Sequence, residues 1–73
     1  MPKLPVVSSR KLIKAFKKMG FDELRQSGSH IVLKHTDGRV AVIPNHKEIK
    51  KGTLRNGILK PLGISVEELI SNL

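Results

Sequence analysis

The chain has 73 residues and no cysteine, which excludes disulfides and thiolate metal sites and leaves room for one small domain. Fourteen lysines and arginines oppose six acidic residues, and a surface with this formal charge of +8 attracts polyanions, so we expect a nucleic-acid partner. Only two aromatic residues, both phenylalanine, are present for base stacking, and no apolar run reaches the roughly 18 residues of a membrane span. We expect a cytoplasmic protein that contacts nucleic-acid backbone and shape and does not bind membranes.

The first predicted element after the N-terminus is a helix. Residues 1–8 are expected to be a loose lead-in, because Pro2 and Pro5 oppose helix formation. A helix is predicted from Ser9 to Met19, with a serine as N-cap and Gly20 as its stop. Its apolar side carries four residues at helical spacing, which are Leu12, Ile13, Phe16 and Met19. Its other side carries five basic residues, which are Arg10, Lys11, Lys14, Lys17 and Lys18.

Three antiparallel strands are predicted next. Residues 21–26 are a weak strand candidate, whereas residues 30–35 are rich in branched apolar side chains and strongly favour a strand. A turn over residues 27–29 separates these two strands. Residues 39–43 form the returning strand, which Pro44 ends, and Asp37-Gly38 is typical of a two-residue type I′ hairpin turn.

The predicted hairpin turn implies a register for the two strands that it joins. With Thr36 opposite Arg39, Leu33 faces Val42 and Val32 faces Ile43. The expected core face then carries Ile31, Leu33, Val40 and Val42. The expected outer face carries His30, Val32, Lys34, Ala41 and Ile43, and it is apolar enough for a partner to cover. His35 falls on the core side, so we expect a structural role for it.

Two further helices complete the predicted fold. Thr53 is expected to be the N-cap of the second helix, whose apolar stripe is Leu54, Ile58, Leu59 and Leu62. Asn56-Gly57 and Pro61 predict a kink or break in it, and Gly63 ends it. Ser65 and Glu68 form a capping box for a short last helix. The result is an α+β fold of order α-β-β-β-α, with a three-stranded antiparallel sheet covered by helices on one face, as in double-stranded-RNA-binding domains.

The three histidines are the candidate general bases, because histidine titrates near neutral pH. His30 begins a strand directly after a flexible turn, which suits either a catalytic imidazole or a polar residue at a strand end. His46 suits a phosphate contact or a solvated position. The carboxylates are scattered, so we expect no metal site and no cofactor.

Three lysines lie just before the expected start of the second helix. Lys47, Lys50 and Lys51 precede Gly52-Thr53, where free backbone N–H groups and the helix dipole favour an anion. The same lysines also fit a solvated charged loop, and the residues alone leave both interpretations open.

A series of short motifs in this order resembles the HicA toxin family over residues 9–73. The motifs are Lys18-Met19-Gly20-Phe21, Gly28-Ser29-His30, Asp37-Gly38-Arg39, Ile43-Pro44-Asn45-His46, Lys51-Gly52-Thr53-Leu54-Arg55 and Leu62-Gly63-Ile64-Ser65-Val66-Glu67-Glu68. The resemblance implies the toxin of a toxin–antitoxin pair, an enzyme that cleaves messenger RNA and inhibits translation, with His30 as the catalytic residue. It also implies a HicB-type antitoxin as partner. One departure is that residues 54–63 are one residue longer than the family's helix.

These observations lead to a hypothesis of metal-independent RNA cleavage in which His30 removes the proton of a ribose 2′-hydroxyl. His46, a lysine or water could be the general acid. The expected RNA-binding residues are Lys11, Lys14, Lys18, Ser29, Lys34, His46, Lys47, Lys50, Lys51 and Thr53. The alternatives are a non-catalytic module that binds double-stranded or other RNA, and a protein-interaction domain whose basic face meets an acidic partner.

Overall fold

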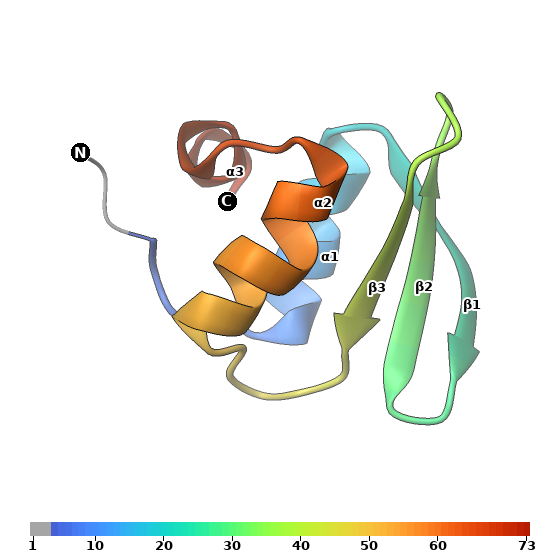
Figure 1. Cartoon of the computed structure of the whole chain (residues 1–73). Helices are drawn as coiled ribbons and strands as arrows, with labels where there is room; N and C mark the ends of the chain where they lie inside the picture. The colour runs from blue at the N-terminus through green and yellow to red at the C-terminus, as the bar shows by residue number, and fades with distance from the viewer. Residues whose placement is uncertain (1–3) are drawn as a thin grey trace.

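The computed structural model describes residues 4–73, and its sheet and helices form two layers (Figure 1). The elements in chain order are α1 (Ser9–Lys18), β1 (Phe21–Ser27), β2 (His30–His35), β3 (Val40–Pro44), the π-helix η1 (Thr53–Leu59), α2 (Lys60–Leu62) and α3 (Val66–Asn72). The strands form one antiparallel sheet in the order β1-β2-β3, and the helices cover one of its faces. The predicted α+β architecture is confirmed.

The first helix begins and ends close to the predicted positions. The Ser8 side chain is the N-cap and accepts a 3.2 Å hydrogen bond from the backbone N–H of Lys11. Lys18 is the last helical residue, one residue before the predicted end, and Gly20 follows with a φ of +102°. Leu12 and Phe16 are completely buried, as their helical spacing predicted.

The lead-in contributes two residues to the core. Leu4 and Val7 belong to the hydrophobic core, and Val7 forms an isolated antiparallel bridge with Ile49. The backbone N–H of Ile49 donates a 2.8 Å hydrogen bond to the carbonyl of Val7. The expectation of a loose segment is therefore wrong from Leu4 to Val7, because two apolar side chains gain more from burial than from remaining mobile. Residues 1–3 lie outside the described part of the chain.

The hairpin between β2 and β3 has a loop that is one residue longer than predicted. The N–H of Gly38 donates to the carbonyl of His35, and the N–H of His35 donates to the carbonyl of Arg39. Gly38 has a φ of +99°, while Asp37 does not have the positive φ that a type I′ turn requires. The loop is thus Thr36-Asp37-Gly38, a three-residue turn that ends in a left-handed glycine.

The extra loop residue shifts the strand register by one. Leu33 lies opposite Ala41 and Val32 lies opposite Val42, so the predicted register is wrong. Because side chains alternate along a strand, this shift exchanges the two faces of β3. Ala41 and Ile43 are buried, whereas Val40 and Val42 are 48% and 49% exposed on the outer face.

The second helix starts earlier than predicted. Lys51 and Gly52 are already helical, and the N–H of Leu54 donates to the carbonyl of Lys50 at 2.9 Å. Gly52, which directly precedes η1, has helical dihedral angles and provides no side-chain cap. The expectation that Thr53 is the N-cap is therefore wrong, because the chain has entered the helix before that residue.

The predicted kink or break is replaced by π winding from Thr53 to Leu59. The N–H of Lys60 donates to the carbonyl of Arg55, five residues earlier. A π turn holds one more residue than an α turn, so it accommodates an inserted residue without interrupting the helix. The residues of the apolar stripe remain buried through it, which are Leu54, Ile58, Leu59 and Leu62. Gly63 ends the helix with a φ of +68°, as predicted.

The last helix packs its apolar side on the same core. Ser65 is its N-cap and accepts a 3.0 Å hydrogen bond from the N–H of Glu68, as the capping box predicted. Leu69 is completely buried. In the middle of the core, the rings of Phe16 and Phe21 lie 4.9 Å apart and join α1 to the sheet. Within residues 4–73, no helix is sufficiently long and apolar to traverse a lipid bilayer.

Candidate functional site

An open pocket of about 510 Å³ lies beside β3, where the loop after Pro44 leads toward η1. Its lining includes both candidate histidines, His30 and His46. Lys50 and Thr53, two of the predicted RNA-binding residues, also line it. The fold therefore brings together residues that are up to 28 positions apart in the chain, from His30 to Ile58. We call this the histidine pocket.

His30 is held on a fixed backbone with an exposed side chain. It is the first residue of β2, opposite Pro44 on β3. The turn before it contains Gly28 with a φ of +59°, and the carbonyl of Ser29 accepts a 2.7 Å hydrogen bond from the N–H of Asn45. Nδ1 of His30 lies 3.5 Å from the Ser29 hydroxyl, the outer limit of a hydrogen bond. The imidazole is thus positioned by its backbone and remains free to contact a ligand.

His46 reaches the same pocket from a loop that α1 holds in place. Its carbonyl accepts a 3.0 Å hydrogen bond from the N–H of Ser9, at the start of α1. The hydroxyl of Ser9 also donates to Oδ1 of Asn45 at 3.2 Å. Ser9 is buried, so these bonds connect the loop to the core, while the His46 side chain stays exposed.

Glu48 is a lining residue of the histidine pocket that sequence reasoning missed. Its carboxylate was one of several scattered along the chain. Glu48 is exposed, and its neighbours Ile49 and Lys50 line the same pocket, although Ile49 is otherwise buried in the core. No spacing of the sequence distinguished Glu48 from the other carboxylates.

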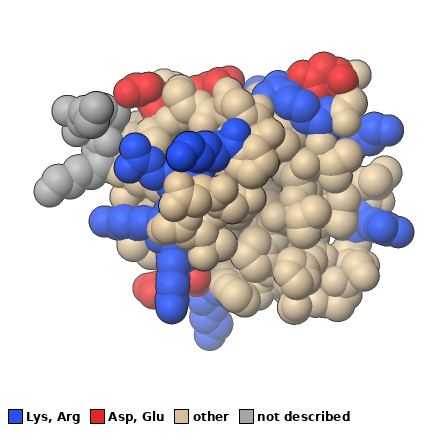
Figure 2. Space-filling view, in the orientation of Figure 1, with Lys and Arg blue, Asp and Glu red and all other residues tan. Residues whose placement is uncertain are grey.

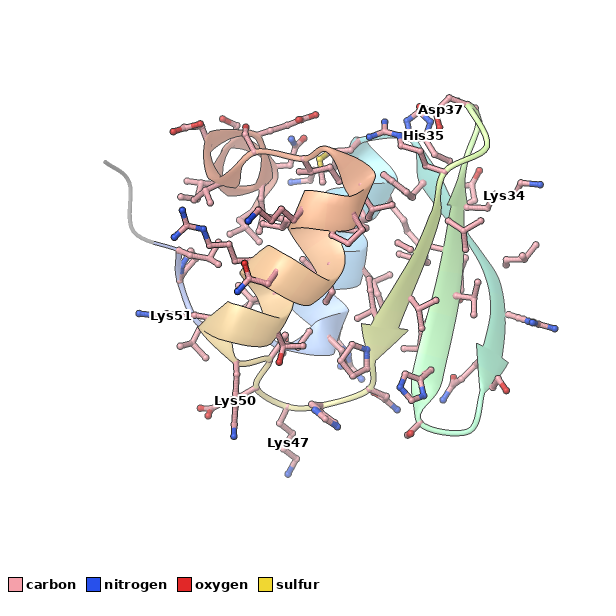
Figure 3. The ribbon with its side chains drawn as sticks, viewed as in Figure 1. Lys34, His35, Asp37, Lys47, Lys50 and Lys51 are labelled. Atoms are coloured by element: carbon pink, nitrogen blue, oxygen red, sulfur yellow. The ribbon has the colours of Figure 1, made fainter. Side chains whose placement is uncertain are left out.

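The loop lysines gather at the end of the sheet where the histidine pocket lies. Figure 3 shows Lys47, Lys50 and Lys51 around the loop and the first turn of the second helix. Lys50 lines the pocket, whereas Lys47 and Lys51 flank it along the chain. Lys34 is placed differently, because it lies near the far end of β2 (Figure 3), about 13 Å from His30 at a rise of about 3.3 Å per residue.

The predicted lysines of α1 are divided between two other pockets. Lys11, Lys14 and Lys18 line a pocket that also includes Val6 and Leu73, close to both ends of the described chain. Lys14 additionally lines a second pocket, which includes Asn45. The structure does not bring Lys11 or Lys18 to His30.

His35 is part of a structural cluster at the opposite end of the sheet. Its Nε2 lies 2.9 Å from the carbonyl of Met19, and its Nδ1 accepts a 3.0 Å hydrogen bond from the N–H of Asp37. Asp37 in turn accepts from the N–H and Nε of Arg39, and Nη1 of Arg39 donates to the carbonyl of Leu62. The structural role predicted for His35 agrees with these contacts.

The neighbours of Asp37 in this cluster shift its ionisation. The hydrogen bond from the backbone N–H of Arg39 is the largest effect, and it stabilises the carboxylate and lowers its pKa below the usual 3.8. Desolvation is the next largest effect and opposes the shift, while the Arg39 and His35 side chains add to the lowering.

The charged side chains leave the molecule predominantly basic. On the face shown in Figure 2, lysines and arginines spread over the helical side and around the edges, and acidic side chains form fewer, smaller groups. Across residues 4–73, the structure contains no group of three or more histidine, aspartate or glutamate side chains that could hold a metal ion.

Comparison with known families identifies the chain. The family described as "HicA toxin of bacterial toxin-antitoxin" matches residues 9–64. No curated protein sequence gives a significant match. The matched segment runs from the first residue of α1 to just after Gly63, and it contains every residue of the histidine pocket. The chain therefore belongs to the HicA toxin family and is the toxin of a toxin–antitoxin system.

Proposed function

We propose that this toxin is a metal-independent endoribonuclease that cleaves messenger RNA in the histidine pocket and thereby inhibits translation. The observation that carries the proposal is that His30 and His46 line one open pocket together with Lys50. An imidazole can accept or donate a proton, so two histidines in one pocket can act as base and acid in one reaction. The net charge of +8 favours capture of the polyanionic substrate.

The proposed reaction begins at the ribose 2′-hydroxyl of the bound RNA. Neutral His30 removes its proton, and the 2′-oxygen attacks the adjacent phosphorus. The bond from phosphorus to the 5′-oxygen breaks, and this oxygen receives a proton from the general acid. The products are a 2′,3′-cyclic phosphate and a 5′-hydroxyl. Positioned proton transfer of this kind contributes about 10²–10⁴-fold to the rate.

His46 is the general acid in this proposal. It lines the same pocket as His30 but comes from the loop after β3, whereas His30 is the first residue of β2, so the two rings can approach the scissile phosphate from two elements. Lys50, in the same lining, would stabilise the negative charge that develops on the phosphate. Lys47, Lys51, Ser29 and Thr53 would contact neighbouring phosphates, and helix and strand lysines farther away would add long-range attraction.

The antitoxin partner is proposed to be of the HicB type and to act by covering this surface. His30 and His46 are both exposed, so a protein bound over the pocket would block access of RNA. A partner with an acidic contact surface would complement the charge of the toxin. We place the free toxin in the cytoplasm, where its proposed substrate is translated.

A non-catalytic RNA-binding module is the second candidate. The observation that favours it is the weak orientation of the His30 ring, whose hydrogen-bond partner is the Ser29 hydroxyl at 3.5 Å. Catalytic imidazoles are usually oriented by a firm second hydrogen bond. In this alternative His30 contacts RNA without transferring a proton.

The test is incubation of mixed-sequence RNA with the purified toxin in EDTA. Wild type, His30→Ala and the control Ser27→Ala, an exposed substitution in the same hairpin, are compared on a gel. Fragments with wild type and Ser27→Ala but not with His30→Ala are expected. Fragment ends with 2′,3′-cyclic phosphate would identify the 2′-hydroxyl as nucleophile. Intact RNA in every lane, with retarded migration, would support the binding module instead.

A further inference from the structure

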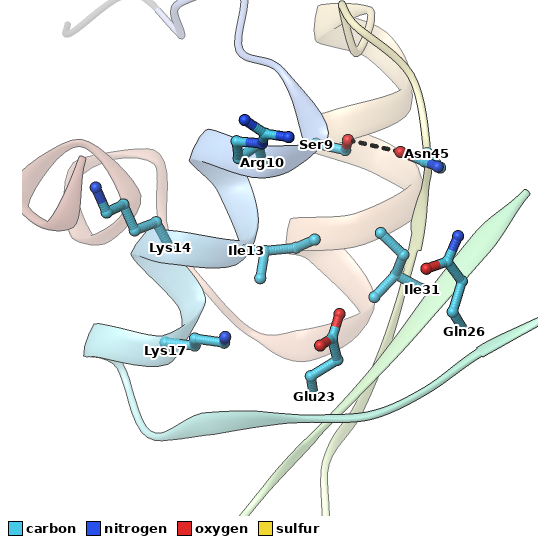
Figure 4. Close-up of a pocket in the computed structure, with 9 residues that line it drawn as sticks. All are labelled: Ser9, Arg10, Ile13, Lys14, Lys17, Glu23, Gln26, Ile31 and Asn45. Atoms are coloured by element: carbon cyan, nitrogen blue, oxygen red, sulfur yellow. Dashed lines mark hydrogen bonds between the residues drawn. The ribbon is translucent and has the colours of Figure 1, made fainter.

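A second pocket, of about 490 Å³, lies between α1 and the sheet (Figure 4). One wall is a face of α1 with three cationic residues, Arg10, Lys14 and Lys17. The opposite wall carries Glu23 and Gln26 of β1. In the proposed RNA cleavage these residues have no role, except that the lysines add long-range attraction for RNA. We call this the α1 pocket.

The cationic wall follows from the helical period. Residues 10, 14 and 17 are spaced by four and three positions, which places them on one side of α1. Arg10 and Lys17 are two turns apart, about 10 Å along the axis at 1.5 Å per residue. In Figure 4 the Lys17 side chain extends toward the Glu23 side, whereas the Lys14 amine points away from it. Arg10 and Lys17 are therefore the cations that best define the α1 pocket.

The remaining lining adds hydrogen-bonding and apolar groups. Glu23 offers a carboxylate, and Gln26 offers both an amide donor and an amide acceptor. Ile13 and Ile31 lie between the two walls (Figure 4). A nucleotide presents all the complementary groups: a phosphate for the cations, base and ribose donors for the carboxylate, and a ring face for the isoleucines. An acidic protein segment fits less well, because Glu23 would repel its carboxylates.

The α1 pocket shares a wall with the histidine pocket. Asn45 lines the α1 pocket, while its neighbours Pro44 and His46 line the histidine pocket. This wall is fixed at both sides, because Ser9 donates to both the carbonyl of His46 and the side chain of Asn45. The N–H of Asn45 donates to the carbonyl of Ser29, which directly precedes His30. An RNA strand that leaves the histidine pocket across Asn45 would therefore reach α1.

We propose that the α1 pocket is a second nucleotide-binding subsite for the same RNA strand, next to the one that holds the scissile phosphate. Arg10 and Lys17 bind its phosphates, and Glu23 and Gln26 form hydrogen bonds with its ribose or base. The inference rests on RNA being the substrate. The subsite should make the toxin bind longer RNA more tightly and favour particular bases beside the cleaved bond.

The test measures RNA binding by fluorescence anisotropy in EDTA at several salt concentrations. All proteins also carry His30→Ala, so that binding is measured without cleavage of the RNA. The variant Arg10→Gln/Lys17→Gln is compared with Lys11→Gln/Lys18→Gln. The control pair removes the same charge at the same spacing from the same helix, but from the side that faces away from the α1 pocket. All four side chains are exposed, and circular dichroism checks that both variants fold.

The expected result is a clearly larger loss of binding of a long oligonucleotide with Arg10→Gln/Lys17→Gln than with Lys11→Gln/Lys18→Gln, which removes only the long-range attraction of two lysines. The slope of log affinity against log salt should fall by about 1.4 for two lost phosphate contacts, at about 0.7 per contact with a single strand. Binding of a dinucleotide should change little, because it occupies the histidine pocket alone. Gln26→Ala should alter the base preference of the long oligonucleotide.

Equal losses in the two double variants would overturn the subsite, since they would indicate general charge attraction. Unchanged RNA binding with weakened binding of the antitoxin would also overturn it and would identify a protein contact. If His30→Ala still cleaves RNA, the proposed catalytic role of His30 fails, while the anisotropy result continues to test the subsite by itself.

Discussion

Nε2 of His35 and the carbonyl oxygen of Met19 lie 2.9 Å apart, and this contact joins the end of α1 to the end of β2. Nε2 is the donor in this contact, because a carbonyl oxygen only accepts, and Nδ1 of His35 lies 3.0 Å from the N–H of Asp37. The ring also meets Phe21 edge-on, with the centroids 4.8 Å apart. A single imidazole therefore connects a helix, a strand and a hairpin loop.

Replacing His35 with alanine should lower the free energy of unfolding by about 2–3 kcal/mol. Two hydrogen bonds of about 1 kcal/mol each and an aromatic contact of about 0.5–1.5 kcal/mol are lost, with some relaxation. Urea denaturation followed by circular dichroism measures the change. Ser27→Ala, at an exposed position at the other end of the sheet, is the control and should stay within about 0.5 kcal/mol of wild type. An unchanged midpoint for His35→Ala would show that the ring is dispensable.

Gly20 should resist substitution for two separate reasons. Its φ is +102°, and a Cβ there would lie 2.8 Å from Nε2 of His35. We expect Gly20→Ala to lower the free energy of unfolding by about 1–3 kcal/mol, measured by thermal or urea denaturation. The double variant Gly20→Ala/His35→Ala should lose less unfolding free energy than the sum of the losses in the two single variants, because the clash disappears with the ring. Gly52→Ala is the matched control, since Gly52 is helical and a Cβ there meets no atom within 4 Å.

The register of β3 can be checked by substitutions at neighbouring positions. Ile43 is completely buried and Val42 is 49% exposed. Ile43→Ala should therefore lower the unfolding free energy by about 2–5 kcal/mol, whereas Val42→Ala should cost well under half of that. The register expected from a two-residue turn predicts the reverse order, so the comparison of the two urea midpoints distinguishes the registers.

Asp37 should contribute to stability in a way that depends on pH. Its pKa in the folded chain is below the usual 3.8, so its contribution is fully present above that value and is lost as pH falls through the lowered pKa. Melting temperatures measured between about pH 5 and pH 2 should therefore fall less steeply for Asp37→Asn than for wild type. Asp22→Asn removes the same charge from β1 and is the control; it should keep the wild-type slope. Equal slopes in all three proteins would refute the contribution of Asp37.

The assignment of His46 as general acid predicts a specific pH profile. The cleavage rate should rise with pH as His30 becomes neutral and fall again as His46 loses its proton. His46→Ala should remove the fall on the alkaline side and should be partly rescued by an RNA analogue with a better leaving group. His30→Ala should not be rescued in this way. Rescue of both variants, or of neither, would contradict the division of roles.

Much of the fold depends on local features and was predictable from the sequence. The helical spacing of Leu12 and Phe16 predicted the buried side of α1, and Ser65 and Glu68 predicted the start of α3. The branched apolar run from 30 to 35 predicted β2. Such signals involve neighbours in the chain, so the residues themselves contain the information. The Gly28-Ser29-His30 motif, through its resemblance to the HicA family, indicated His30 as the candidate catalytic residue, which stays a prediction.

Only the tertiary structure decided the register, the π winding and the composition of the two pockets. The hairpin loop adopts three residues instead of two because His35, Asp37 and Arg39 form hydrogen bonds around it. The second helix winds as a π-helix over the segment in which Leu54, Ile58 and Leu59 are buried. His46 and Glu48 line the same pocket as His30, and Asn45 contacts α1. These relations depend on hydrogen bonds and packing between segments that are distant in the chain. Local preference does not specify those contacts, because their free energies are gained only when the whole core assembles.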